Sequence, residues 1–94
     1  HLGPLRRGDV HPYIRHRLSV AGVSADLISS TLVRSVYRRS GGIPRVINPI
    51  CDRALLGAFA RGAARIDGRI LRQAAGEVRG RERPGRLGRP RSVK

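Results

Sequence analysis

Residues 40–48, with the sequence Ser-Gly-Gly-Ile-Pro-Arg-Val-Ile-Asn, constrain the fold most, because they combine the end of one helix with the start of another. Gly41 can adopt the left-handed conformation that commonly terminates a helix. Gly42 is expected to be a permissive cap. Pro44 is expected in the first helical turn, where its missing N–H costs little. The segment therefore predicts a tight turn between two helices, with Arg45 at the start of the second.

Arg45 is the candidate ligand-binding residue of this turn. The N-terminal end of a helix carries partial positive charge that favours an anion, and a guanidinium group can make forked contacts with phosphate oxygens. This combination indicates a phosphate-binding arginine. The alternative is a tight turn between helices that carries a solvated arginine.

The charge balance favours a polyanionic partner. The chain of 94 residues has 20 basic residues against six acidic ones, which gives a net charge of +14. Nucleic acid, nucleotide phosphates and an anionic membrane surface all fit this balance. A chain of this length forms one small domain at most and buries a limited share of its surface, so we expect it to be marginally stable unless it docks on something larger.

Several other classes are disfavoured by the sequence. No stretch approaches the roughly 20 apolar residues of a membrane span and no signal peptide is recognisable, so we expect a soluble chain. Cys51 is the single cysteine, which excludes a disulfide framework and a cysteine metal site. His11 and His16 are five residues apart, on different sides of their helix, and do not form a metal site. No nucleophile and base are arranged for catalysis.

Apolar residues recur at helical spacing in four segments and predict an all-α fold. The first helix is expected over residues 9–21, with Asp9 as its cap, Pro12 in its first turn and Gly22 at its end. The second is expected over about residues 29–39. The side chains expected to face the core from these two helices are Val10, Ile14, Leu18, Ala21, Leu32, Val33, Val36 and Tyr37.

The third helix, over about residues 43–60, is the longest and is expected to form the centre of the core. The fourth is expected to start after Asp67, its cap, and to end at Gly80. The inward positions of these helices are Ile43, Val46, Ile47, Ile50, Cys51, Ala54, Leu55, Ala58, Ile70, Leu71, Ala74, Ala75 and Val78. Residues 80–94 carry a charge of +5 without an apolar period and are expected to be a disordered basic tail.

A second face of the third helix is not purely polar. It contains Arg45, Asn48, Asp52, Leu56 and Phe59. A free-standing helical bundle should be polar there, so Leu56 and Phe59 predict contact with a surface outside these 94 residues. The alternative is a pair of exposed apolar side chains, which are common when they occur singly.

Three segments carry a family resemblance. Residues 13–18 read Tyr-Ile-Arg-His-Arg-Leu, residues 51–56 read Cys-Asp-Arg-Ala-Leu-Leu, and the glycine turn of residues 40–48 lies between them. In order and spacing they resemble the C-terminal helical lid of AAA+ ATPases of the general secretion pathway protein A (ExeA) type. The Gly-x-Pro-Arg-x-x-Asn element is shared with other AAA+ lids, whereas the two flanking segments point to the narrower family. The resemblance runs from residue 1 to about residue 80.

This resemblance implies an architecture and a role for the turn. It implies a linker over residues 1–8 that leaves an ATPase core, and a small four-helix lid over residues 9–79. Arg45 matches the sensor-2 arginine, which contacts nucleotide phosphates and couples their state to the lid angle. Gly41, Gly42 and Pro44 would position it. Asn48 is interpreted as a hydrogen-bonding partner within the same helical turn, or alternatively as an ordinary polar surface residue.

The resemblance also implies what must come from elsewhere. The chain has neither a Gly-x-x-x-x-Gly-Lys-Ser/Thr loop nor an apolar strand ending in Asp-Glu, so it cannot hydrolyse ATP alone. ATP and magnesium would bind only in an intact parent. The implied partners are an ATPase core, neighbouring subunits and secretion apparatus proteins at the inner membrane, which implies a cytoplasmic location. Pro49 departs from the family pattern, and we expect it to kink the third helix or to cost about 3 kcal/mol.

A small basic DNA-binding or protein-interaction domain is the alternative function. The second and third helices with their glycine turn imitate a helix-turn-helix, and the charge would support phosphate contacts. Pro49 in the would-be recognition helix, and apolar residues on both of its sides, argue against sequence-specific binding. Nonspecific binding by the basic tail fits better.

Overall fold

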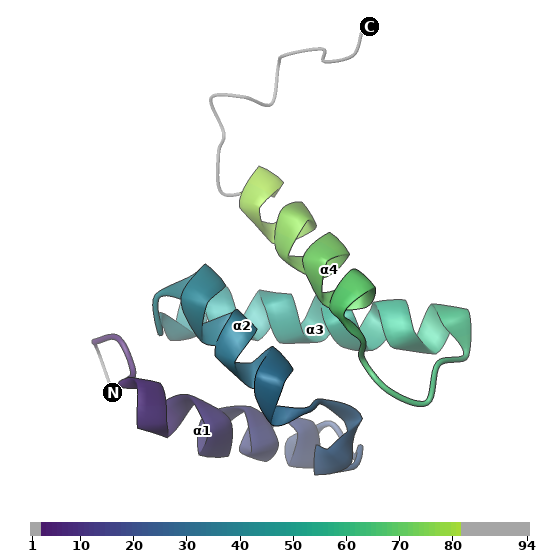
Figure 1. The fold of residues 1–94 in the computed structure, drawn as a ribbon, viewed down its shortest axis with the longest axis horizontal. Helices are drawn as coiled ribbons and strands as arrows, with labels where there is room; N and C mark the ends of the chain where they lie inside the picture. The colour runs from purple at the N-terminus through teal and green to yellow at the C-terminus, as the bar shows by residue number, and fades with distance from the viewer. Residues whose placement is uncertain (1–2, 82–94) are drawn as a thin grey trace, which may run out of the picture.

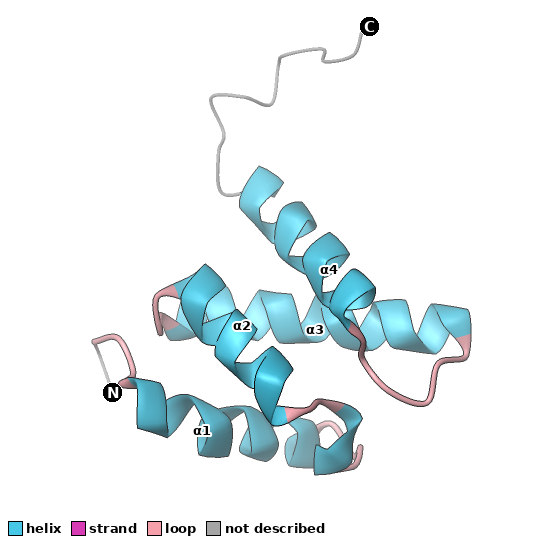
Figure 2. Cartoon of the chain, in the orientation of Figure 1, coloured by secondary structure: helices cyan, strands magenta, loops and turns pink. Residues whose placement is uncertain are grey.

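The computed structural model describes residues 3–81, and every regular element in them is helical (Figure 2). The elements are α1 (Arg7–Val20), the short 3-10 helix η1 (Ala25–Leu27), α2 (Ser30–Ser40), α3 (Pro44–Arg61) and α4 (Gly68–Arg81). The all-α class with four helices is confirmed. None of these helices is long and apolar enough to cross a membrane.

Helix α3 forms the middle of the molecule (Figure 1). Helices α1 and α3 run in the same direction, α2 leads back from the end of α1 to the start of α3, and α4 packs chiefly against α3. Gly57 permits part of this packing, because a Cβ atom there would lie 3.2 Å from the Cγ2 atom of Ile70. The two helices can approach closely where this side chain is missing.

The core combines residues from all four helices, as the apolar periodicity predicted. Its members are Val10, Ile14, Leu18, Ile28, Val33, Val36, Ile47, Ile50, Cys51, Ala54, Ala58, Ile66, Ile70, Leu71, Ala74, Ala75 and Val78. Leu32, Tyr37, Val46 and Leu55 pack against it with partial exposure, whereas Ala21 is exposed, contrary to expectation. Ala21 lies just beyond the last residue of α1, where the helical period no longer holds.

The start of α1 differs from the prediction. The helix begins at Arg7, so Asp9 is its third residue and not its cap. The Asp9 carboxylate instead accepts a hydrogen bond of 3.4 Å from the backbone N–H of Arg6, which is favourable in a first helical turn. Pro12 is the sixth helical residue and lies beyond the first turn. The carbonyl of Gly8 therefore lacks its usual helical donor.

Helix α3 continues through Pro49 to Arg61. Pro49 is its sixth residue, so the Arg45 carbonyl also lacks a helical donor. Pro49 follows a first helical turn that begins at Pro44, and the residues after Pro49 anchor the helix in the core. The proline therefore does not end the helix. The energetic cost expected from Pro49 stays a prediction.

Helix α4 begins as predicted but extends further. The Asp67 side chain accepts a hydrogen bond of 2.8 Å from the backbone N–H of Ile70, which confirms the cap. The helix passes through Gly80 to Arg81, the last described residue, so the predicted end at Gly80 is wrong. Glycine ends a helix when it adopts positive φ, and Gly80 is not among the glycines that do so. Residues 82–94 of the predicted tail lie outside the described residues.

Candidate functional site

The turn between α2 and α3 contains two consecutive left-handed glycines. Gly41 has φ of +65° and its N–H donates to the Tyr37 carbonyl at 2.9 Å, so it ends α2 as predicted. Gly42 has φ of +78° but is not the cap of α3. Ile43 occupies that position in extended conformation, and Pro44 is the first helical residue as expected. Gly42 instead contacts the N-terminal segment that precedes α1.

This contact places the chain before α1 directly against the turn. The Leu5 N–H donates to the Gly42 carbonyl at 2.7 Å, and Gly42 is buried. A Cβ atom on Gly42 would collide with the carbonyl oxygen of Leu5. Both the positive φ and the close approach of the Leu5 backbone therefore require glycine at this position.

Arg45 is exposed at the second position of α3. Within residues 3–81, its side chain forms no hydrogen bond or ion pair, so the guanidinium group is available to a ligand. The backbone of this turn offers less than the sequence suggested. Pro44 has no N–H, and those of Val46 and Ile47 both donate to the Ile43 carbonyl at 2.9 Å. Anion binding here would depend mainly on the Arg45 side chain.

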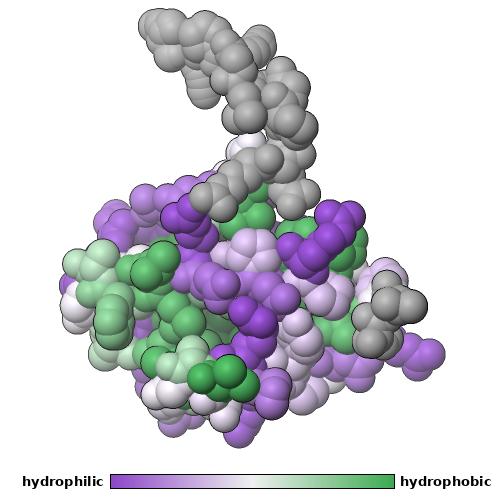
Figure 3. All heavy atoms as spheres, turned by 180° about the vertical axis from the view of Figure 1, so that it is seen from behind, coloured by the Kyte–Doolittle hydropathy of each residue, from purple (hydrophilic) through white to green (hydrophobic). Residues whose placement is uncertain are grey.

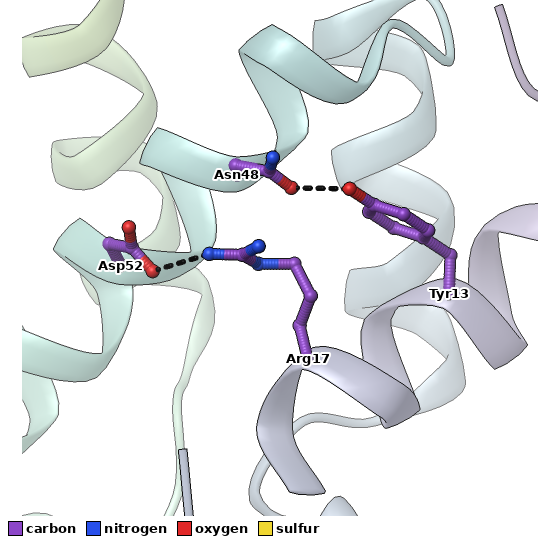
Figure 4. A network of polar contacts seen from close by, with 4 residues as sticks. All are labelled: Tyr13, Arg17, Asn48 and Asp52. Carbon is purple, nitrogen blue, oxygen red and sulfur yellow. Dashed lines mark hydrogen bonds and ion pairs between the residues drawn. The ribbon is translucent and has the colours of Figure 1, made fainter. Parts of the chain in front are cut away.

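The sequence predicts that Asn48 bonds within its own helical turn, and the structure shows a different partner. Its Oδ1 atom accepts a hydrogen bond of 2.7 Å from the hydroxyl of Tyr13 on α1 (Figure 4). The residue lies one turn after Arg45 on the side of α3 that faces α1, so the nearest strong donor belongs to another helix. Asn48 thus connects the Arg45 end of α3 to α1.

A second pair lies one turn further along both helices. Arg17 NH2 donates to Asp52 Oδ1 at 3.2 Å, with side-chain exposures of 33% and 61% (Figure 4). We call the four residues Tyr13, Arg17, Asn48 and Asp52 the polar seam. Each pair joins positions 35 residues apart, so the seam also fixes the parallel register of α1 and α3.

The two bonds of the polar seam differ in weight. The Tyr13 to Asn48 bond is partly buried, and a hydrogen bond of this type contributes about 1 kcal/mol. The more exposed Arg17 to Asp52 pair contributes between about 0 and 1 kcal/mol, which salt reduces further.

Tyr13 and Arg17 were not recognised as site residues from sequence. Their spacing of four residues was visible, but no local pattern showed the residues on α3 that they meet.

The predicted second face of α3 is therefore divided. Its Asn48 and Asp52 contact α1 and are partnered within the chain. Leu56 and Phe59 remain 60% and 83% exposed. The prediction that this face contacts a surface outside the chain therefore remains only for its C-terminal half.

Cys51 lies in the core next to the polar seam. It is a free, buried cysteine, as the apolar stripe predicted. Burial raises the pKa of the thiol to about 11. The charge of Arg17 lowers this pKa and the charge of Asp52 raises it, both by less than burial does. The thiol is thus protonated at neutral pH and is not a candidate nucleophile.

Comparison with known proteins identifies a relative in a secretion pathway. Over 80 residues, the chain is 49% identical to general secretion pathway protein A of Aeromonas hydrophila. The match covers 85% of this chain but 15% of the Aeromonas protein, so the chain corresponds to a small part of that relative. No protein-family model and no solved structure matches the chain. The identity over most of the chain supports a relationship to this type of secretion protein.

Proposed function

We propose that this chain, as a relative of one segment of general secretion pathway protein A, forms the helical lid of a longer AAA+ ATPase. In this proposal Arg45 is the sensor-2 arginine, which contacts nucleotide phosphates. Gly41, Gly42 and Pro44 set its position. Residues 1–8 link the lid to the ATPase core, residues 9–79 form the lid, and residues 80–94 form an appended basic segment.

The contact between Leu5 and Gly42 is the observation that carries this proposal. The segment that would enter from the core is hydrogen-bonded to the turn, three residues before Arg45. A change in the direction of that segment would act on the same turn that aims the guanidinium group. Phosphate contact at Arg45 and lid angle would therefore be coupled through a short mechanical connection.

The polar seam supports the same role. A phosphate-sensing arginine is useful only if its helix moves as one unit with the rest of the lid. Asn48 binds α1 one turn after Arg45, and Asp52 binds α1 again one turn later. The seam would transmit a pull on Arg45 to α1 without rotation of α3 within the bundle.

The remaining chemistry belongs to other parts of the parent protein. A bound magnesium ion would neutralise phosphate charge, but the described residues contain no cluster of three or more side chains that could hold a metal ion. This chain supplies a cationic contact to the phosphates. Its partners would be the ATPase core, neighbouring subunits and proteins of a secretion apparatus, on the cytoplasmic side of the inner membrane.

The nucleic-acid alternative has less structural support. The helix after the turn would be the recognition helix, but much of α3 is committed to the core through Ile47, Ile50 and Cys51. Its exposed side chains include Asp52, Leu56 and Phe59 between Arg45 and Arg61, so the basic residues do not form a row. Such a face suits an apolar partner better than a DNA groove.

A chimera tests the proposal. The segment of the Aeromonas protein that matches this chain is replaced by residues 1–94, and ATP turnover is measured with Arg45→Ala, with Arg45→Lys, and with Arg34→Ala as a matched control. We expect Arg45→Ala to lower turnover roughly tenfold or more, because one preorganised charged contact is lost. Arg34 lies exposed on α2, so its replacement should leave turnover unchanged.

Two results would contradict the proposal. An active chimera whose turnover does not depend on Arg45 would remove the sensor role. A chimera that folds but lacks the ATP turnover measured for the unaltered Aeromonas protein in the same assay would argue against the lid assignment itself. Circular dichroism of each variant shows whether the helical fold is retained.

A further inference from the structure

Three large apolar side chains are exposed in the described part of the chain, and they come from the C-terminal ends of α1 and α3. Val20, Leu56 and Phe59 are 73%, 60% and 83% exposed. We call them the apolar patch. Seen from behind, apolar residues gather on the left of the molecule, over the C-terminal ends of these two helices (Figure 3). Scattered apolar side chains are ordinary on a surface, but a group on adjoining helix ends indicates an interaction site.

The apolar patch continues the polar seam along both helices. On α1, Val20 follows Arg17 by three residues, and on α3, Phe59 follows Asp52 by seven, so each lies on the same side of its helix as the seam residue before it. The register of 35 residues places Phe59 level with position 24, beyond the end of α1 at Val20. The strip of α3 that contacts α1 thus becomes apolar where α1 has ended.

We propose that the apolar patch docks an amphipathic helix that carries acidic side chains around its apolar face. The strip of α3 is bonded to α1 through Asn48 and Asp52, and a helix placed beyond the end of α1 would cover its exposed part. Docking of this type uses apolar anchors at i, i+3, i+4 and i+7. This inference goes beyond the proposed function and does not require the lid assignment.

Charge complementarity identifies the partner as acidic. The chain has 20 basic residues against six acidic ones. Asp52 and Glu77 form ion pairs with arginines, while Asp9 and Asp67 accept backbone hydrogen bonds. Arg61 lies two residues after Phe59, is exposed, and donates a hydrogen bond to the neutral Gln73 side chain, so a carboxylate beside the patch would find a cation. A second copy of the chain, with the same charge of +14, would be repelled.

Binding of a designed peptide to the 94-residue chain tests the inference. The probe is a fluorescent peptide of about 18 residues with leucines on one helical face and glutamates on the other, long enough to be helical. A control peptide has the same composition with the leucines distributed around the helix. Binding is measured by fluorescence anisotropy for the wild type, Leu56→Ser, Phe59→Ser and Arg38→Ser. The last removes a charge on α2, away from the patch.

We expect the amphipathic peptide to bind more tightly than its scrambled control. Leu56→Ser and Phe59→Ser should each weaken binding about tenfold, because buried aromatic and aliphatic anchors dominate such contacts. Arg38→Ser should have a much smaller effect. All three positions are exposed, so the variants should keep the wild-type circular dichroism spectrum.

Every other outcome of these binding measurements contradicts the inference. Equal binding of both peptides, or no effect of the patch variants, would mean that charge alone attracts the probe. Absence of binding would exclude an acidic helix as occupant. A dimer in light scattering that Phe59→Ser dissociates would assign the patch to a second copy. Binding to vesicles of anionic phosphatidylglycerol that depends on Phe59, without peptide binding, would assign it to a lipid surface.

Discussion

The hydroxyl of Tyr13 donates a hydrogen bond of 2.7 Å to Asn48 Oδ1 and thereby joins α1 to the helix that begins with Arg45. The two residues are 35 positions apart, and the bond is partly buried. It lies one helical turn from the candidate phosphate-binding arginine. The orientation of α3 against α1, and with it the position of Arg45, therefore depends on this pair.

Tyr13→Phe should destabilise the chain by about 1 kcal/mol, because it removes the hydroxyl donor and keeps the ring. Asn48→Ala should cost at least as much, since it leaves the Tyr13 hydroxyl without its acceptor. A double-mutant cycle from urea unfolding measures the coupling, which we expect to be about 1 kcal/mol. Additive effects of the two substitutions would show that the bond does not contribute to stability.

Gly42→Ala should destabilise the chain more than Gly41→Ala. Both glycines have positive φ, so either alanine costs about 1 kcal/mol from backbone strain. Only at Gly42 does the added Cβ atom also meet the Leu5 backbone, whereas the space around Gly41 is open. Thermal unfolding compares the two, and amide exchange at Leu5 reports whether its bond to Gly42 is lost. Equal stability of the two variants would contradict the close approach.

Cys51 should make the stability of the chain pH-dependent in the alkaline range. Folding raises the thiol pKa from 9.0 to about 11, so the unfolded chain releases the proton first as the pH rises. The stabilising contribution is thus complete below pH 9 and is lost between about pH 9 and 11, by up to roughly 3 kcal/mol. Urea unfolding across this range should show a steeper loss for the wild type than for Cys51→Ala. Parallel curves would contradict a buried, protonated thiol.

The fold was largely predictable from sequence because its signals are local. Apolar spacing located all four helices, and Gly41, Pro44 and Asp67 were correctly assigned to their ends, since each acts through its own backbone or nearest turn. Gly80 was assigned wrongly because a glycine ends a helix only when the chain turns there. A sequence shows the permissive residue but not the turn.

The site was less predictable because its contacts are distant in sequence. Arg45 could be placed at a helix start, but the bonds from Asn48 to Tyr13 and from Gly42 to Leu5 join segments about 35 residues apart. Helical periodicity identifies the side of a helix that meets something, and it does not identify what is met. The division of the second face of α3 into a partnered half and an exposed half follows from where α1 ends, which only the packed structure shows.

Pro49 provides the last prediction, because it removes the helical donor of the Arg45 carbonyl. Pro49→Ala would restore an N–H at this position and should stabilise the chain by about 1 to 2 kcal/mol. This is less than the full helical penalty of proline, because alanine also increases the conformational freedom of the unfolded chain. Pro12→Ala is the matched comparison, since Pro12 is likewise the sixth residue of its helix. Thermal and urea unfolding measure both variants.

Stabilisation at Pro12 together with destabilisation at Pro49 would show that the Pro49 ring makes packing contacts that outweigh the missing bond. In the chimera, a stabilising Pro49→Ala that also lowers ATP turnover would mean that the loosened first turn of α3 is needed for the movement of Arg45.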